Sequence, residues 1–122
     1  MTATLIKIPR STECENCGDI KPRGYYMFQV EKDVYCPRCA RRRKLALPET
    51  IGERIRSLRK ANRYSRPYLA TLCETTTTMI AGYEWGKSLP GAVKLGQLAT
   101  QLNTTSDYII GISEDPNWRG DE

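Results

Sequence analysis

The stretch that decides the fold of this 122-residue chain reads Thr50-Ile51-Gly52-Glu53-Arg54-Ile55-Arg56-Ser57-Leu58-Arg59. Thr50 and Glu53 have the spacing of a capping box, in which each side chain accepts a hydrogen bond from the other residue's backbone amide. Ile51, Ile55 and Leu58 then recur at i, i+4 and i+7, which places them on one face of a helix. Most of the arginines fall off this stripe, so the sequence predicts a helix with one packed face and one basic face.

Four further short helices are expected downstream, each marked by a cap, a stop signal or an apolar stripe. Ser65 caps the second, which ends near Cys73, and Thr75 or Thr76 caps the third, which ends at Gly86. The fourth follows an apolar stripe, and the fifth covers residues 106–111. The apolar residues that we expect to face the core are Tyr68, Leu69, Leu72, Cys73, Ile80, Leu95, Leu98, Ala99 and Leu102.

Four of the five cysteines form two C-x2-C pairs, Cys14 with Cys17 and Cys36 with Cys39. Such a pair aims two sulfurs at one ion from a single tight turn, and two pairs complete a tetrahedron. Residues 18–35 between them have room for two short β-strands around a turn at Glu31-Lys32-Asp33. The spacing predicts a zinc ribbon with structural Zn²⁺, since four cysteine ligands leave no open coordination position for catalysis.

Two other interpretations of these cysteines stay open. Disulfides are one, although no basic and then apolar leader opens the chain and we therefore expect a reducing, cytoplasmic location. Iron is the other, because Cys36-Pro37-Arg38-Cys39 resembles half of a rubredoxin site. Cys73 stands apart among core-like neighbours, and we interpret it as a buried, inert thiol rather than a reactive one.

Composition narrows the class of protein further. The chain has no histidine, which excludes imidazole acid-base chemistry and mixed cysteine-histidine metal sites. Its mean hydropathy of -0.55 leaves no room for a membrane span. The net charge of +5 favours a polyanionic partner, although basic surfaces also serve solubility. Since the carboxylates fall in caps or in the tail, no enzyme is expected.

Several separated landmarks together resemble the lambda-repressor and Cro-like helix-turn-helix family of the xenobiotic-response-element type. The resemblance covers residues 51–112 and implies a five-helix domain that binds double-stranded DNA. Its landmarks are residues 51–59, Leu69-Ala70, Ile80, Tyr83-Glu84, Gly86-Lys87, Pro90, Leu98-Ala99 and residues 107–111.

The resemblance also implies roles for particular residues. The recognition helix would run from Thr76 to Glu84 and lie in the major groove. Its base contacts would come from Thr77, Thr78 and Gly82, with Met79 either adding an apolar contact or packing in the domain. Phosphate contacts would come from Arg66 at the second helix and from Lys87, Ser88 and the amide of Trp85. Arg59 and Glu84 match a pair that bridges the first and third helices, and we assign them to structure.

The predicted fold class is mainly α, a helix-turn-helix domain preceded by a small β zinc ribbon. Its expected parts are a zinc-ribbon module with a basic exit segment at residues 1–46, a linker at 47–50, the helical domain at 51–112 and a solvated acidic tail at 113–122. A short helix could start in the exit segment after the last cysteine pair and end at Pro48.

The role of the ribbon has two interpretations. In the first, the DNA interface extends to the ribbon, where flanking phosphates or a minor groove would be contacted by Arg38, Arg41, Arg42, Arg43 and Lys44. Alternatively, the ribbon binds a protein partner, as in certain bacterial antitoxins that combine a zinc module with a helix-turn-helix. Under both interpretations we expect a bacterial or phage-encoded DNA-binding regulator of transcription. Its expected effect is repression.

A homodimer is expected, because the family binds DNA chiefly as symmetric dimers. The candidates for its interface are Ile109, Ile110, Ile112 and Trp118. Trp118 could equally fold back on its own domain.

Overall fold

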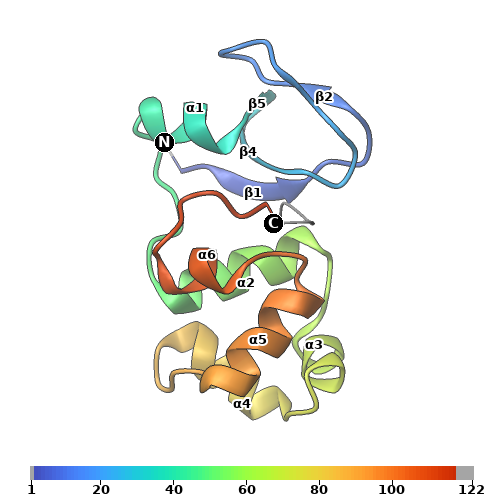
Figure 1. The fold of residues 1–122 in the computed structure, drawn as a ribbon, viewed down its shortest axis with the longest axis vertical. Helices are drawn as coiled ribbons and strands as arrows, with labels where there is room; N and C mark the ends of the chain where they lie inside the picture. The colour runs from blue at the N-terminus through green and yellow to red at the C-terminus, as the bar shows by residue number, and fades with distance from the viewer. Residues whose placement is uncertain (1, 118–122) are drawn as a thin grey trace. The chain divides into compact units, whose positions relative to one another are not determined.

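The computed structural model describes residues 2–117, and the chain divides into two compact units, residues 1–47 and 48–122. Figure 1 shows the order of elements along the chain. The first unit, here called the ribbon unit, holds the strands and one helix. The second, the helical unit, is entirely α in its described part. The ribbon unit contains β1 (Thr4–Lys7), β2 (Thr12–Glu13), β3 (Ile20–Lys21), β4 (Tyr26–Val30), β5 (Asp33–Tyr35) and α1 (Pro37–Arg42). The helical unit contains α2 (Ile51–Ala61), α3 (Arg66–Leu72), α4 (Thr77–Trp85), α5 (Ala92–Gln101) and α6 (Ser106–Ile110).

The helices of the helical unit begin where the caps predict. Both bonds of the capping box at Thr50 and Glu53 are present at the start of α2. Ser65 caps α3, and Thr76 rather than Thr75 caps α4. Gly86 ends α4 with a φ of 79°, in the left-handed region that glycine adopts without strain. The local signals therefore suffice to place these helices.

The core of the helical unit matches most of the predicted apolar residues. Ile55, Leu58, Leu69, Ile80, Leu98 and Leu102 are fully buried, and so is Cys73. Tyr68 was expected inside but is 51% exposed, because its ring packs edge-on against Tyr64 near the surface. Leu72 and Leu95 are only half-buried. The prediction that Ile109 belongs to an interface is wrong, since its side chain is 0% exposed and belongs to the core.

Gly52 sets the distance between α2 and α4. A Cβ atom at this position would lie 2.5 Å from the carbonyl oxygen of Glu84 and 2.6 Å from that of Tyr83. Real Cβ atoms do not come so close to backbone oxygens, so only glycine allows this approach. The second residue of α2 therefore fixes where the end of α4 rests.

Arg54 corrects the prediction that the arginines of α2 share an exposed face. Its side chain is buried and donates hydrogen bonds to the carbonyl oxygens of Pro48, Tyr108 and Ser113, at 3.2, 2.6 and 2.9 Å. The guanidinium also lies 4.4 Å from the centroid of the Tyr108 ring. A buried charge is tolerated when it is hydrogen-bonded, and each of the three guanidinium nitrogens of Arg54 has a partner.

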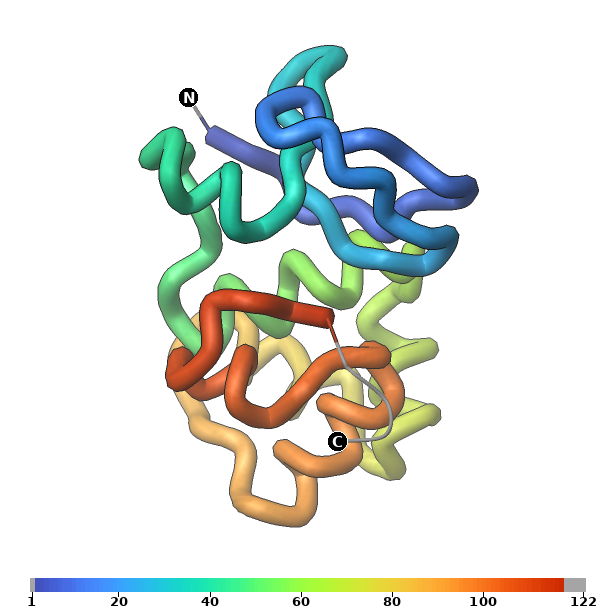
Figure 2. Tube along the Cα trace, turned by 45° about the horizontal axis from the view of Figure 1, so that its top comes forward, coloured from blue at the N-terminus to red at the C-terminus, as the bar shows by residue number. Residues whose placement is uncertain are grey.

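The start of the acidic tail is held against the helical unit, which corrects the expectation of a solvated segment. Residues 113–117 turn back across the unit (Figure 2). Arg54 pairs with the carboxylate of Glu114 at 3.2 Å, and the hydroxyl of Thr104 donates to the carbonyl of Pro116 at 2.6 Å. Trp118 and the rest of the tail lie outside the described residues.

The ribbon unit has β4 at the centre of a three-stranded antiparallel sheet, in the order β1-β4-β5. Leu5 of β1 faces Phe28, and Phe28 faces Tyr35 of β5. The turn between β4 and β5 places Glu31 in the left-handed region, at a φ of 56°. β2 and β3 form a separate two-stranded sheet. The predicted hairpin of β4 and β5 is present, whereas β1 was not predicted.

The helix predicted for the exit segment lies earlier than expected. α1 begins at Pro37, inside the second cysteine pair, and ends at Arg42. Lys44 follows with a φ of 56°, a left-handed conformation that cannot continue a helix. The stop therefore comes from the backbone at Lys44 rather than from Pro48. None of the helices in residues 2–117 combines the length and the apolar character needed to cross a membrane.

Candidate functional sites

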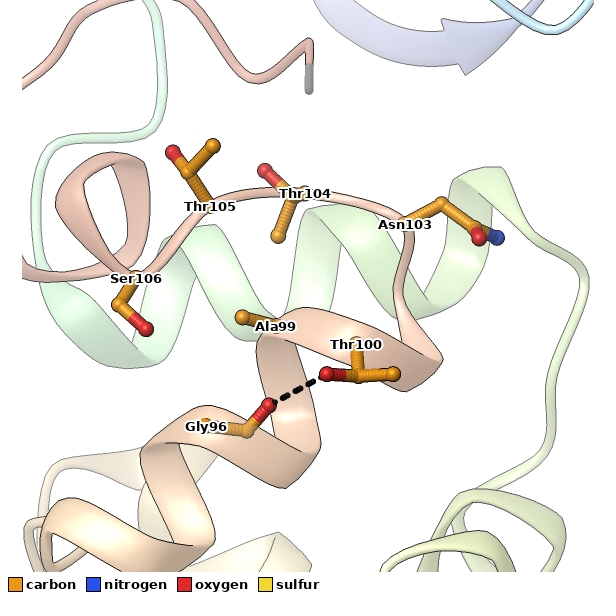
Figure 3. A pocket seen from close by; sticks show the side chains of 7 residues that line it. All are labelled: Gly96, Ala99, Thr100, Asn103, Thr104, Thr105 and Ser106. Carbon is orange, nitrogen blue, oxygen red and sulfur yellow. Dashed lines mark hydrogen bonds between the residues drawn. The ribbon is translucent and has the colours of Figure 1, made fainter. Parts of the chain in front are cut away.

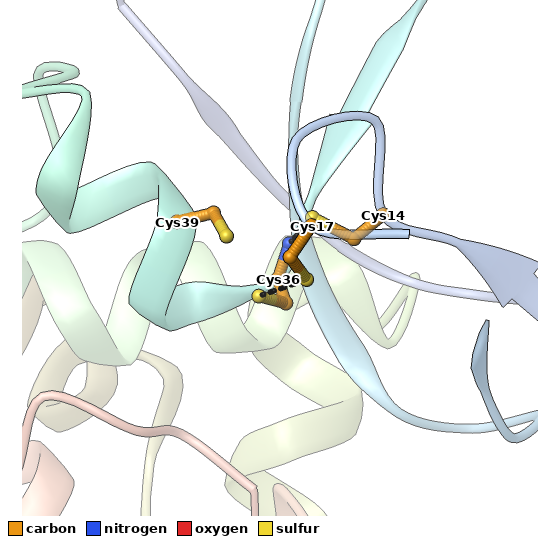
Figure 4. Close-up of side chains that lie close together, drawn as sticks. All are labelled: Cys14, Cys17, Cys36 and Cys39. Carbon is orange, nitrogen blue, oxygen red and sulfur yellow. Dashed lines mark hydrogen bonds between the residues drawn. The ribbon is translucent and has the colours of Figure 1, made fainter. Parts of the chain in front are cut away.

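The four paired cysteines converge on one point in the ribbon unit (Figure 4). Cys14 and Cys17 lie in the loop after β2, Cys36 caps the start of α1, and Cys39 lies within α1. Their Sγ atoms all lie within 4.8 Å of one another, and those of Cys17 and Cys36 are 3.9 Å apart. Four sulfurs bound tetrahedrally to zinc at about 2.3 Å would be spaced by about 3.8 Å. The thiols thus have the number, the type and nearly the spacing of a zinc site.

The environment of the thiols prepares one of them to ionise first. Burial raises the pKa of Cys14, but hydrogen bonds from the backbone amides of Cys17, Cys36 and Asn16 outweigh it and lower the pKa to about 6. Burial raises the pKa of Cys36 to about 12, and its neighbouring thiols Cys39 and Cys14 add to the rise. A cluster of like charges resists complete ionisation until a cation offsets it. The donor set therefore fits a divalent metal that prefers sulfur ligands.

The base-contacting residues expected from the sequence lie at one end of α4. Thr77 and Thr78 occupy the exposed first turn, and Met79 beside them is 39% exposed. Gly82 is half-buried one turn later, with the side chain of Ser88 close to it. The hydroxyl of Thr76 is used by the cap, where it accepts from the amide of Met79.

Glu84, at the other end of α4, binds two arginines instead of the one expected. Its carboxylate is 1% exposed and accepts from Arg59 at 2.6 and 3.3 Å. Arg66, expected as a phosphate contact, also donates to this carboxylate through its Nε at 3.1 Å. The Arg66 side chain remains 31% exposed. One buried carboxylate therefore ties α2 and α3 to α4 and fixes the orientation of α4 within the helical unit.

The loop after α4 holds the other expected phosphate contacts. The backbone amides of Lys87 and Ser88 both donate to the carbonyl of Gly82, at 2.9 and 3.3 Å. The Lys87 side chain is exposed and that of Ser88 is half-buried. Trp85 is the last residue of α4, so its amide lies within the helical hydrogen-bonding pattern, while its ring is 68% exposed.

The basic exit segment does not present its four cations equally. Arg41, Arg42, Arg43 and Lys44 are all exposed. Arg43 nevertheless lies over the ring of Tyr35, with 5.0 Å between its guanidinium carbon and the ring centroid. Its Nη1 also lies 3.5 Å from the side-chain oxygen of Asn16, between Cys14 and Cys17. Sequence reasoning missed this contact, because nothing in the run of basic residues distinguishes Arg43.

A hollow of about 550 Å³ lies between α5 and the loop that leads to α6. Figure 3 shows its lining, in which the hydroxyl of Thr100 donates to the carbonyl of Gly96. None of its seven lining residues carries an ionisable side chain, so the hollow offers no group for acid-base catalysis. They are Gly96, Ala99, Thr100, Asn103, Thr104, Thr105 and Ser106.

Comparisons with known proteins point to the helical unit. No family model matches the sequence. An uncharacterized HTH-type transcriptional regulator of Bacillus subtilis (strain 168), YobD, is 34% identical over 65 residues, which are 53% of this chain and 58% of that protein. This chain therefore spans less than two thirds of that relative.

Two solved structures are similar over about half of this chain. The P22 c2 repressor bound to a synthetic operator is 26% identical with a TM-score of 0.50, over 51% of this chain and 94% of that chain. The restriction-modification controller protein C.AhdI of Aeromonas hydrophila is 30% identical with a TM-score of 0.47, over 49% and 91%. The likeness to the P22 repressor confirms the predicted lambda-repressor-like fold of the helical unit. The strands and the clustered cysteines of the ribbon unit confirm the strand-containing cysteine module that was expected before it.

Proposed function

We propose that this chain, whose helical unit is a helix-turn-helix domain similar to that of lambda-like repressors, regulates transcription by binding operator DNA. In this proposal α3 and α4 form the helix-turn-helix, and α4 lies in the major groove. The complete protein acts as a homodimer. The effect on transcription is repression, and the ribbon unit stabilises the protein through structural Zn²⁺.

The observation that carries the proposal is the contrast between the two ends of α4. Its last turn is fixed by the buried Glu84 carboxylate, while its first turn presents Thr77 and Thr78 to solvent. A rigidly held helix with short polar side chains at an open end suits insertion into the major groove, where a threonine hydroxyl can bond several bases and its methyl can contact thymine. Met79 adds an exposed apolar surface beside them, and Gly82 lets the backbone approach closely.

Phosphate contacts would then come from positions flanking α4. Lys87 and Ser88 follow the helix, and the partly exposed guanidinium of Arg66 lies at the start of α3. Arg41, Arg42 and Lys44 extend the basic surface on the ribbon unit. Each phosphate contact adds affinity for all DNA sequences and a salt dependence, whereas the threonines select among sequences.

Zinc fits the ribbon unit because four thiols within 4.8 Å of one another match its preferred ligands in number and type. When bound, the ion cross-links the loop after β2 to the start of α1 and supplies folding energy rather than catalysis. For a unit of fewer than fifty residues, such a cross-link is a common substitute for a larger core.

Selection from random DNA tests the proposal. The full-length, zinc-loaded protein should enrich an inverted repeat with half-sites about one helical turn, roughly 34 Å, apart. Thr77→Ala and Thr78→Ala should change the preferred bases, whereas the control Thr100→Ala, an exposed threonine on α5, should not. If the folded protein enriches no sequence, DNA reading by α4 alone is refuted, and the antitoxin-type alternative with a protein bound to the ribbon unit gains support.

A further inference from the structure

Arg43 contacts both halves of the cysteine cluster. On one side its guanidinium lies near Asn16, which sits between Cys14 and Cys17. On the other side it covers the ring of Tyr35, the residue directly before Cys36, and its backbone amide donates to the carbonyl of Cys39 at 2.9 Å. The two halves are about twenty residues apart in the sequence. They meet at the sulfurs and through the hydrogen bond from the backbone amide of Glu15 to the carbonyl of Val34, at 2.9 Å, and the Arg43 side chain adds a further link between them.

The neighbouring cations differ from Arg43 in these contacts. Arg41 and Arg42 belong to the same short segment and are exposed in the same way. Within residues 2–117, neither side chain has a ring contact or a side-chain hydrogen bond. All three arginines carry a positive charge, but only the Arg43 side chain is held in place by contacts with Asn16 and Tyr35.

The charge of a metal site with four thiolates explains why a cation would be held beside it. A divalent ion with four thiolates carries a net charge of about -2, which a nearby cation stabilises in a partly buried site. A planar guanidinium can stack on an aromatic ring and donate a hydrogen bond from its edge at the same time, which a lysine ammonium cannot do. Outer groups of this kind orient metal ligands and tune their affinity.

We propose that Arg43 is a positioning residue for the metal site, clamping the two cysteine pairs together and offsetting the charge of the thiolates, and is not a DNA contact. The proposal rests on the metal site proposed above. It removes Arg43 from the basic surface offered to DNA and leaves Arg41, Arg42 and Lys44 on it.

Metal transfer from the full-length protein tests this role. Zn²⁺ loss to a chromophoric chelator and Co²⁺ affinity, followed by the thiolate absorption bands, would be measured for Arg43→Ala and for Arg41→Ala and Arg42→Ala as matched controls. Arg43→Ala should lower metal affinity by about 10- to 100-fold. The controls should stay within about twofold, since they touch no part of the cluster. Arg43→Lys should recover only part of the loss, because it restores the charge without the stacked plane.

DNA binding supplies the second readout. The salt dependence of binding should be unchanged in Arg43→Ala, whereas loss of a phosphate contact lowers the slope of log K against log salt by about one. Asn16→Ala removes the hydrogen-bond acceptor but keeps Arg43, and it should also weaken metal binding. This variant replaces Arg43→Ala in the metal titrations if Arg43→Ala does not fold.

Two results would overturn the inference. If Arg43→Ala or Asn16→Ala holds metal as the wild type does, or if Arg43→Ala lowers the salt slope by about one with metal affinity intact, Arg43 has no positioning role. If the wild type takes up neither Co²⁺ nor Zn²⁺, the proposed metal site itself fails. The wild-type titration therefore distinguishes the failure of this inference from that of the proposed function.

Discussion

Both units of this chain have an apolar core, but only the ribbon unit adds a cluster of thiols to it. The helical unit buries aliphatic side chains from successive helices, among them Ile55, Ile80 and Leu98. The ribbon unit has strands of two to five residues and brings four thiols within 4.8 Å of one another. Apolar packing is intrinsic to the chain, whereas the thiol cluster needs a cation. If the cluster binds zinc as proposed, the ribbon unit depends on metal supply and the helical unit does not.

Metal removal should therefore produce the largest effect and confine it to one unit. Structural zinc contributes roughly 10 to 16 kcal/mol to the folding of small domains. Chelation should collapse the amide resonances of residues 14–39 in a heteronuclear NMR spectrum and leave those of α2 to α6 dispersed. Loss of most helical signal on chelation would contradict the separation of the two units.

A pair of cysteine variants sharpens the same contrast. Cys36→Ser should abolish metal uptake, because this buried sulfur belongs to the cluster. Cys73→Ala removes an equally buried thiol of the helical unit and should leave metal uptake unchanged. Equal metal loss in both variants would show that the units do not fold separately.

Arg59→Ala should give the next largest effect, now in the helical unit. It leaves the buried carboxylate of Glu84 with Arg66 as its remaining partner. An incompletely paired buried charge costs about 3 kcal/mol of unfolding free energy. Denaturant titration would measure this loss, and Arg56→Ala, an exposed arginine on the same helix, should change stability by less than about 0.5 kcal/mol. If Arg59→Ala were as stable as the wild type, the bridging role of Arg59 would be refuted.

Gly52→Ala should destabilise the helical unit by about 1 to 3 kcal/mol, because the new methyl group meets the carbonyls of Tyr83 and Glu84. Gly96→Ala on α5 is the matched control, since a Cβ there has no atom within 4 Å. That substitution should stabilise by up to about 1 kcal/mol through helix propensity. Thermal unfolding of the two variants checks whether their stabilities change in opposite directions. A stabilising Gly52→Ala would contradict the close approach of α2 and α4.

The capping box of α2 should give the smallest effect, and one that depends on pH. Hydrogen bonds from the amides of Thr50 and Glu49 lower the pKa of Glu53 below its usual value. A lowered pKa in the folded state means that the stabilisation is present above the unfolded pKa of about 4.3 and is lost as the pH falls through the folded pKa.

Glu53→Gln should therefore reduce stability at pH 7 by less than about 1 kcal/mol, since solvent screens this exposed carboxylate. The difference from the wild type should shrink as the pH falls toward 3 in a series of melting curves. Glu49→Gln, which removes a neighbouring exposed carboxylate, is the control. If the stability difference between the wild type and Glu53→Gln grew on acidification, the pKa of Glu53 could not be lowered in the folded state.

How far the sequence predicted the molecule also differs between the two units. In the helical unit Thr50, Ser65, Thr76 and Gly86 are local signals, and local signals place helix ends correctly. In the ribbon unit β1 was missed, because a four-residue edge strand shows itself only by pairing with β4. The spacing of the cysteines correctly predicted that the four thiols converge, since it encodes a geometric requirement rather than a preference.

The residues that sequence reasoning misplaced are long or apolar side chains whose partners are distant in the chain. Arg54 looked solvent-facing but binds carbonyls at Tyr108 and Ser113, and Ile109 looked like an interface residue but fills the core. Arg66 stays a candidate phosphate contact, but its ion pair with Glu84 was not predicted, because only the packing of α3 against α4 brings the two side chains within reach. Periodicity gives the face of a helix, but not which distant group will cover it.

Mapping of amide chemical shifts on DNA binding shows whether α4 contacts the DNA. The full-length, zinc-loaded protein would be titrated with the DNA enriched by selection and followed by heteronuclear NMR. The largest changes should fall on Thr77, Thr78 and Gly82 of α4 and on Lys87 and Ser88 in the loop that follows it. Changes confined to the ribbon unit, with α4 unperturbed, would contradict the claim that this helix reads DNA.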